Sequence, residues 1–115
     1  MPQKDRRLYL IHIAECCTKI LDYTAGIREE WPTVPLIVDA VCRNIEVIGE
    51  AANRLDAEYR ERHSEVPWRS IINTRNILIH GYDVVNGAVL GGIVERDIPA
   101  LAAAVKRLLA EVPDE

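Results

Sequence analysis

The chain has 115 residues, 49% of them hydrophobic and 28% charged, and its formal net charge is −4. This length fits one domain, so we expect a single domain over residues 1–115 that is folded almost throughout. The acidic balance argues against a broad nonspecific surface for nucleic acid. Any contact with a nucleic acid must therefore be local.

Neither a membrane span nor a secretory leader is expected. The apolar runs are short and soon interrupted by charge, far from the roughly 20 residues that a span requires. Near the N-terminus, Glu15 comes before a long apolar segment could form, which is unlike a secretory signal. We therefore expect a soluble protein of the cytoplasm, with no membrane partner.

The three cysteines predict neither a disulfide framework nor a zinc site. Their number is odd, and Cys16 and Cys17 are adjacent while Cys42 is distant, so the C-x-x-C spacing of a zinc site is missing. We interpret all three as small core residues.

The first predicted helix covers residues 5–30. Apolar residues recur there at steps of three and four, which is typical of an amphipathic helix. Trp31 and Pro32 are expected to end it, because proline removes an amide donor and restricts the residue before it. The predicted apolar stripe consists of Leu8, Ile11, Ala14, Cys17, Leu21, Ala25 and Ile27.

A second, long helix is predicted from residue 36 to about residue 60. Its apolar positions form a nearly continuous seam, so we expect it to pack along one side. The opposite face is charged and polar, and a solvated surface is the plainest interpretation of that face. The seam consists of Val38, Val41, Cys42, Ile45, Ile48, Ala52, Leu55 and Tyr59.

A third helix is predicted to begin near Pro67 and to run to His80. Proline suits the first turn of a helix, since an N–H there would have no helical partner anyway. Gly81 follows as a left-handed C-cap, which would place Tyr82 just past the end of the helix.

The last helix is predicted over residues 87–111. Its apolar stripe is interrupted early by Gly91 and Gly92, which weaken the first turns, and Pro99 either kinks it or opens a new segment. No alternating strand pattern competes, so the predicted fold class is all-α. The stripe consists of Val89, Ile93, Leu101, Val105, Leu108 and Leu109.

Arg75, Asn76 and His80 place polar groups in an otherwise apolar helix. At 100° per residue, Asn76 and His80 share a face, while Arg75 and His80 lie about 140° apart and meet only if the long arginine stem bends. Metal-independent RNA cleavage needs a base, an acid and positive charge over the phosphate. An imidazole that titrates near neutral pH and a guanidinium fork supply all three.

The spacing of these residues has a plainer explanation as well. A histidine in the last turn of a helix often only complements the helix dipole, and an arginine on a helix is usually a solvated charge. Spacing alone does not decide between the two interpretations. For His12 and His63, which have no such companions, we keep the structural interpretation.

The segment RNILIHGY, residues 75–82, resembles the motif of the HepT-like branch of the HEPN superfamily. In that branch, four residues separate an arginine from a histidine, and a tyrosine follows two positions after the histidine. Three more blocks are similar to the branch and occur in the same order: RNIEVIGEAANRL at 43–55, VPWRSI at 66–71 and ERDIPAL at 95–101. The similarity extends from about residue 5 to residue 112, and Gly91 and Gly92 depart from it.

This resemblance implies an up-and-down bundle of four to five helices that forms a homodimer. The arginine and histidine motifs of two subunits would face each other across a cleft, so that each active site is composite. By this resemblance Arg75 and His80 are the catalytic pair and Asn76 supports the site. The implied activity is that of an endoribonuclease that needs no metal or other cofactor and acts as the toxin of a type VII toxin–antitoxin pair.

The resemblance also implies a partner and a modification. HepT-like toxins are paired with MntA-like minimal nucleotidyltransferases, which can add AMP to the tyrosine of the motif, and Tyr82 matches that position. The added phosphate would satisfy the charge of Arg75 and block RNA. Alternatively, the Tyr82 ring packs over the helix end with its hydroxyl hydrogen-bonded.

Glu46 and Glu50 have two interpretations. A carboxylate on the second helix could orient His80 or pair with Arg75. It could equally form a pair within its own helix, Arg43 with Glu46 or Glu50 with Arg54. We leave both glutamates out of the catalytic set.

Two other function classes remain beside the nuclease. The chain could be a noncatalytic helical module that binds a nucleotidyltransferase, an alternative that the acidic net charge favours modestly. A metal-dependent enzyme is the least supported, because no cluster of carboxylates and histidines has ligand spacing and no glycine-rich phosphate loop is present.

Overall fold

The computed structural model describes residues 1–79 and 87–112. These residues form helices and turns without a β-strand, so the predicted all-α class is confirmed. The helices are α1 (Gln3–Thr24), η1 (Trp31–Thr33), α2 (Pro35–Arg54), α3 (Ala57–Arg62), α4 (Trp68–Ile79), α5 (Gly87–Gly92), the π-helical η2 (Ile93–Asp97) and α6 (Ile98–Glu111).

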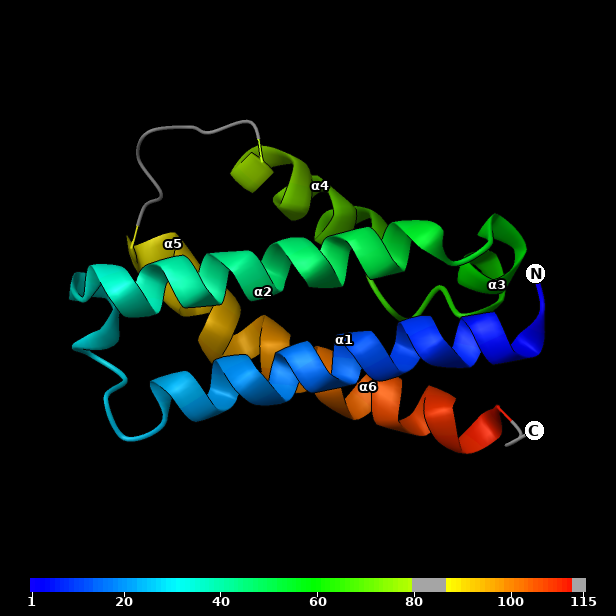
Figure 1. Ribbon diagram of the computed structural model, residues 1–115, viewed down its shortest axis with the longest axis horizontal. Coiled ribbons are helices and arrows are strands. Elements are labelled where there is room, and N and C mark those ends of the chain that lie inside the picture. Colours follow the sequence, from blue (N-terminus) through cyan, green and yellow to red (C-terminus); the bar gives the residue numbers. More distant parts are fainter. Residues whose placement is uncertain (80–86, 113–115) are drawn as a thin grey trace.

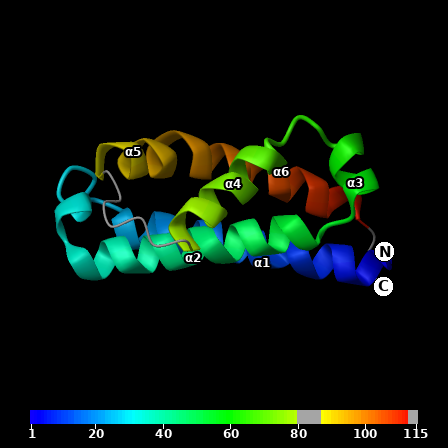
Figure 2. The ribbon, with the colours of Figure 1, turned by 90° about the horizontal axis from the view of Figure 1, so that it is seen from above.

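Helix α2 is the central element of the bundle. It packs against α1 on one side and against α4 on the other, and α1 in turn packs against α6, as Figure 1 shows. Seen from above, α4 lies obliquely between α2 and the row formed by α5 and α6 (Figure 2). Helix α4 therefore rests mainly on α2, on the outside of the bundle.

The core lies where α1, α2 and α6 face one another. Fully buried side chains come from all three helices, and Trp31 of η1 closes one end with 2% of its surface exposed. Removing this apolar surface from water is the main source of the stability of such a bundle. Its main members are Leu10, Ile13, Cys17, Ile20, Val41, Ile45, Ile48, Ala52, Leu101, Val105 and Leu108.

Helix α1 ends six residues earlier than predicted, and another face of it is buried. The Thr24 hydroxyl donates a hydrogen bond to the carbonyl of Ile20. The backbone then leaves the helical conformation, because Ala25 is extended and Gly26 adopts a positive φ of 75°, which favours glycine. The predicted stop at Trp31 was therefore wrong. Leu8, placed in the predicted stripe, is 47% exposed, because apolar residues surround this helix and periodicity alone cannot select its buried face.

The predicted second helix is two helices. Leu55 and Asp56 are extended, and the Asp56 carboxylate caps α3 by accepting a hydrogen bond from the Tyr59 amide. Leu55 and Tyr59 are both buried, as the seam predicted. The predicted second helix is too long because the spacing of its apolar residues continues across the break between α2 and α3.

The last predicted helix has the expected bounds but contains a π-helical turn. In η2 the amide of Ile98 donates to the carbonyl of Ile93, five residues earlier, and this wide turn precedes Pro99, whose ring crowds the turn before it. Val89 was wrongly assigned to the buried stripe, since it is 61% exposed, whereas Leu90 and Val94 are buried.

No helix of the described part is long and apolar enough to cross a lipid bilayer.

Candidate active site

Helices α2 and α4 approach each other closely at Gly49 and Arg75. A Cβ built on Gly49 would overlap Arg75 Cβ, would lie 2.7 Å from Arg75 Cγ and would lie 3.2 Å from the carbonyl oxygen of Ile71. Only a residue without a side chain permits this contact. The aliphatic stem of Arg75 is therefore laid directly over the backbone of α2.

The guanidinium of Arg75 has no carboxylate partner in the part of the chain that the structure describes. Its Nη1 donates to Asn76 Oδ1 at 2.8 Å, a neutral acceptor, and no ion pair joins Arg75 to another described residue. Its Nε is buried without a hydrogen-bond partner in that same set. A buried donor without a partner costs free energy, typically about 1–3 kcal/mol, so this guanidinium can still gain from binding an anion.

The predicted site residues fall into two groups. Arg75 and Asn76 lie in the last two turns of α4 and are in contact with each other. His80 and Tyr82 lie outside the described residues, and so does Gly81, the predicted C-cap. The proposed pairing of Arg75 with His80 and the modification of Tyr82 thus stay predictions.

The two glutamates of α2 form pairs within their own helix. Arg43 Nη1 lies 3.5 Å from Glu46 Oε2, and Arg54 Nη2 donates to Glu50 Oε1 at 3.0 Å. These are the intrahelical pairs that were one of the two interpretations of the sequence. Both glutamates therefore have local partners on the surface of α2.

The cysteines are core residues, as predicted. Cys16 and Cys17 are buried and Cys42 is half-buried, and all three are free thiols. Burial raises the pKa of the Cys17 thiol to about 12, with a further contribution from Cys16, and burial likewise raises the pKa of Cys42. Thiols with raised pKa values are poor nucleophiles and poor metal ligands.

The two other histidines do not join the Arg75 region. His12 is exposed on α1. His63 follows α3, with its Nδ1 3.4 Å from Glu65 Oε1 and its ring centroid 4.5 Å from that of Tyr59. Within residues 1–79 and 87–112, no group of three or more His, Cys, Asp or Glu side chains is arranged to hold a metal ion.

Gly49 is the residue of this region to which the sequence analysis gave no role. The sequence feature that points to Gly49 is its place inside a strongly periodic helix, where a glycine costs about 1 kcal/mol of stability relative to alanine. Such a position suggests close packing, but nothing in the sequence indicates that Arg75 is what packs there.

The chain is similar to known ribonuclease families and proteins. A family model described as Ribonuclease HepT-like matches residues 13–108. A protein of Caldanaerobacter subterraneus that is named a candidate RNase is 38% identical over 92% of this chain and 96% of its own length. A protein of Thermococcus cleftensis named a candidate ribonuclease HepT is 34% identical, over 92% of this chain and 97% of its own length. No solved structure matches.

Proposed function

Because the chain belongs to the HepT-like ribonuclease family, we propose that it is a metal-independent endoribonuclease, a single HEPN domain over residues 1–115. Arg75 and His80 are its catalytic pair, and Asn76 positions Arg75. The observation that carries this proposal concerns Arg75, whose stem lies over Gly49 and whose guanidinium is bonded to a neutral amide. Its buried Nε has no hydrogen-bond partner among the described residues.

The proposed reaction is an internal transesterification. The ribose 2′-oxygen attacks the adjacent phosphorus while an imidazole takes its proton. The bond from phosphorus to the 5′-oxygen then breaks, and an imidazolium returns a proton to that oxygen. The guanidinium of Arg75 binds the nonbridging oxygens, where negative charge accumulates. The products are a 2′,3′-cyclic phosphate and a 5′-hydroxyl.

We propose that the active unit is a homodimer, because one subunit contributes only one His80 and the reaction uses both a base and an acid. Apolar surface on and beside α4 supports this. Ile77 on α4 is 55% exposed, and a groove of about 420 Å³ between α4 and α6 is lined in part by Ile71, Ile98 and Leu101. An exposed apolar side chain such as Ile77 beside an apolar groove often marks a protein interface.

As a toxin of the cytoplasm, the enzyme would be silenced by an MntA-like nucleotidyltransferase that transfers AMP to the Tyr82 hydroxyl. The attached phosphate would add a bulky negative charge to the motif that contains Arg75. It would both occupy the guanidinium and repel RNA.

The test is cleavage of labelled RNA by the purified wild type and by His80→Ala, with and without EDTA. The wild type is expected to cut in EDTA and to leave cyclic phosphate ends, while His80→Ala remains folded and inactive. Cleavage that depends on added Mg²⁺ would contradict the mechanism. Mass spectrometry of the protein after incubation with ATP and an MntA-like nucleotidyltransferase then tests whether AMP is attached to Tyr82.

A noncatalytic module that docks a nucleotidyltransferase is the second candidate, favoured by the net charge of −4. Growth arrest on expression of the chain alone, relieved by Arg75→Ala, supports the nuclease. Harmless expression together with a stable complex with the transferase supports the module.

A further inference from the structure

A hollow of about 610 Å³ lies between the end of α2, the short helix α3 and the start of α4. We call it the α3 hollow. Its polar lining includes Asn53 of α2, Arg60 of α3, and Arg69 and Asn73 of α4, and its apolar lining includes Trp68 and Ile72.

The two arginines of the α3 hollow have no carboxylate partner. Arg6, Arg28, Arg43 and Arg54 each form an ion pair, whereas Arg60 and Arg69 form none with any residue that the structure describes. Arg60 also has a buried Nε without a hydrogen-bond partner there. In an acidic chain, two such arginines facing one hollow are a local site for an anion.

The surroundings hold this lining in place. The Trp68 indole is buried and donates to the carbonyl of His63 at 3.0 Å, which fixes the start of α4 against the segment that follows α3. Asp56 caps the N-terminus of α3. Arg60 and Arg69 therefore extend from anchored helix ends, which lowers the entropy that binding must remove.

The α3 hollow is lined by residues on the same face of α4 as Asn76, which is part of the proposed site. Arg69, Asn73 and Asn76 follow each other at steps of four and three residues and thus share one face of α4. Asn76 is the residue that accepts a hydrogen bond from Arg75. From Arg69 to Asn76 the helix rises roughly 10 Å, so a strand bound at Arg75 can reach the hollow.

We propose that the α3 hollow binds a backbone phosphate of the RNA strand that is cut at Arg75. This inference rests on the proposed function. Arginine forks match phosphate oxygens, and amides such as Asn53 and Asn73 bond sugar and phosphate groups. Trp68 is only 5% exposed, so no aromatic face is available for a base to stack on. The contact recognises the strand without reading its sequence.

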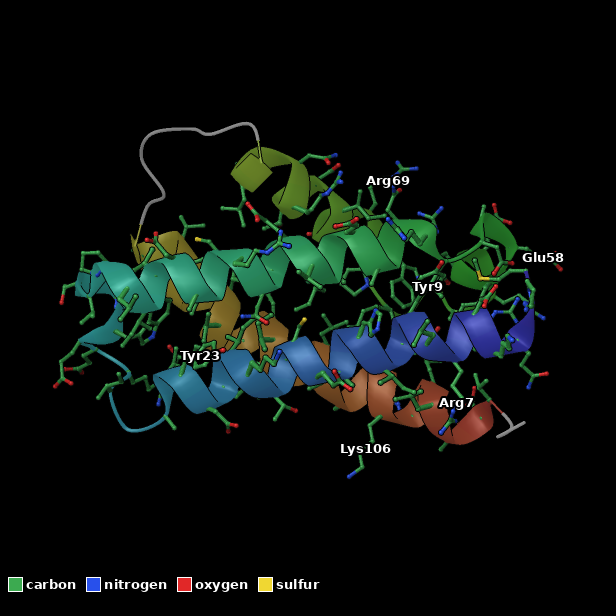
Figure 3. All side chains as sticks on the ribbon, viewed as in Figure 1. Arg7, Tyr9, Tyr23, Glu58, Arg69 and Lys106 are labelled. Carbon is green, nitrogen blue, oxygen red and sulfur yellow. The ribbon has the colours of Figure 1, made fainter. Side chains whose placement is uncertain are left out.

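One carboxylate also lines the hollow, that of Glu61, and it opposes an incoming phosphate. Arg69→Gln and Glu61→Gln should therefore change RNA affinity in opposite directions. Lys106→Gln is the matched control. Lys106 carries the same charge as Arg69, and its side chain extends from α6 on the opposite side of the molecule (Figure 3).

The experiment measures kcat and KM for cleavage of a long RNA over a range of salt concentrations. Arg69→Gln and Arg60→Gln are expected to raise KM about three- to tenfold with kcat unchanged. Arg69→Gln should also reduce the slope of log KM against log salt concentration by about 0.7, the loss of one phosphate contact on a single strand. Glu61→Gln should lower KM, and Lys106→Gln should leave both constants alone.

Binding measurements separate this inference from the proposed function. Fluorescence anisotropy with labelled RNA is recorded for each variant in the His80→Ala background, and circular dichroism confirms that each is folded. If the wild type does not cleave RNA but Arg69→Gln still weakens binding, the catalytic proposal fails and the α3 hollow stands. Equal binding by wild type and Arg69→Gln, or loss of binding only to the transferase, overturns the RNA assignment.

Discussion

Arg6 and Arg75 are both arginines with a buried Nε that lacks a hydrogen-bond partner among the described residues, yet their surroundings differ. Arg6 Nη2 donates to Asp56 Oδ1 at 3.1 Å, and its guanidinium lies 4.5 Å from the centre of the Tyr59 ring. Arg75 has the neutral oxygen of Asn76 instead. One guanidinium is paired with a carboxylate, and the other has no such partner within residues 1–79 and 87–112.

This difference distinguishes a structural arginine from a candidate catalytic one. Arg6 joins α1 to the cap of α3 across 50 residues of sequence, and its carboxylate and ring contacts offset the cost of partial burial. For Arg75 the contact with Gly49 supplies position, whereas none of the residues that the structure describes supplies an opposite charge. A phosphate could supply the compensation that the protein lacks.

Gly49→Ala should have the largest effect of any change outside the catalytic pair. The new Cβ would meet Arg75 Cβ, and no side-chain rotation can relieve a contact between two such atoms. Overpacking typically costs about 1–3 kcal/mol and outweighs the gain in helix propensity. A displacement of about 1 Å at Arg75 would lower the RNA cleavage rate about 100-fold.

Gly91→Ala is the control for Gly49→Ala. Gly91 is also helical, but nothing lies within 4 Å of a Cβ built there, so the substitution should stabilise the protein by up to about 1 kcal/mol without changing the cleavage rate. Thermal melting and a cleavage assay on both variants check this pair. Wild-type activity in Gly49→Ala would refute the role given to the contact.

Asp56→Ala should lower the stability of the protein by disrupting the contacts around Arg6. It removes the cap of α3 and the partner of Arg6 together, so we expect a loss of about 1–2 kcal/mol in the free energy of unfolding. Asp56→Asn keeps a capping oxygen and should lose less. Urea denaturation measures both, and equal losses would show that the cap contributes nothing.

The pH dependence of stability should isolate the charge of this pair. Partial burial acts to raise the pKa of Asp56, but the hydrogen bond and charge of Arg6, with the Tyr59 amide, outweigh it and hold the pKa below its usual value. In the unfolded chain the pKa of an aspartate is about 4, and because the pKa of Asp56 is lower in the folded protein, its ionised carboxylate stabilises the fold above about pH 4. This contribution is lost as the pH falls from there through the pKa of the folded protein. The stability gap between wild type and Asp56→Asn should therefore close below about pH 4.

Local spacing was enough to predict several features of this fold. The helical class, the bounds of the last helix, and the pairs of Arg43 with Glu46 and Glu50 with Arg54 all follow from the 3.6-residue period. These features depend on neighbours within one or two helical turns. No tertiary contact is needed to specify them.

The helix boundaries were missed where a cap competed with the apolar period. Leu55 and Tyr59 continue the seam of α2 into α3, so the pattern showed no break. The residue that indicates a break is Asp56, because aspartate favours the N-cap of a helix and this one lies inside the predicted helix. On α1, packing against α2 and α6 selects Leu10 and Ile13 rather than Leu8 for the core.

The residues of the candidate site could be proposed from the sequence, and they stay predictions, but the way the fold holds Arg75 could not be foreseen. Arg75 and Asn76 could be selected from chemistry and resemblance, and the structure brings their side chains together. The contact of Gly49 with Arg75 joins positions on two helices, and sequence spacing within one helix carries no information about such a crossing.

The most direct test of the central claim compares Arg75→Gln with Arg6→Gln in one experiment, by measuring the RNA cleavage rate per folded molecule together with the melting temperature. Arg75→Gln is expected to cut about 100- to 1000-fold more slowly at an unchanged or raised melting temperature. Arg6→Gln is expected to melt several degrees lower while cleaving at the wild-type rate. An Arg75→Gln protein that cleaves RNA as fast as the wild type would contradict the account.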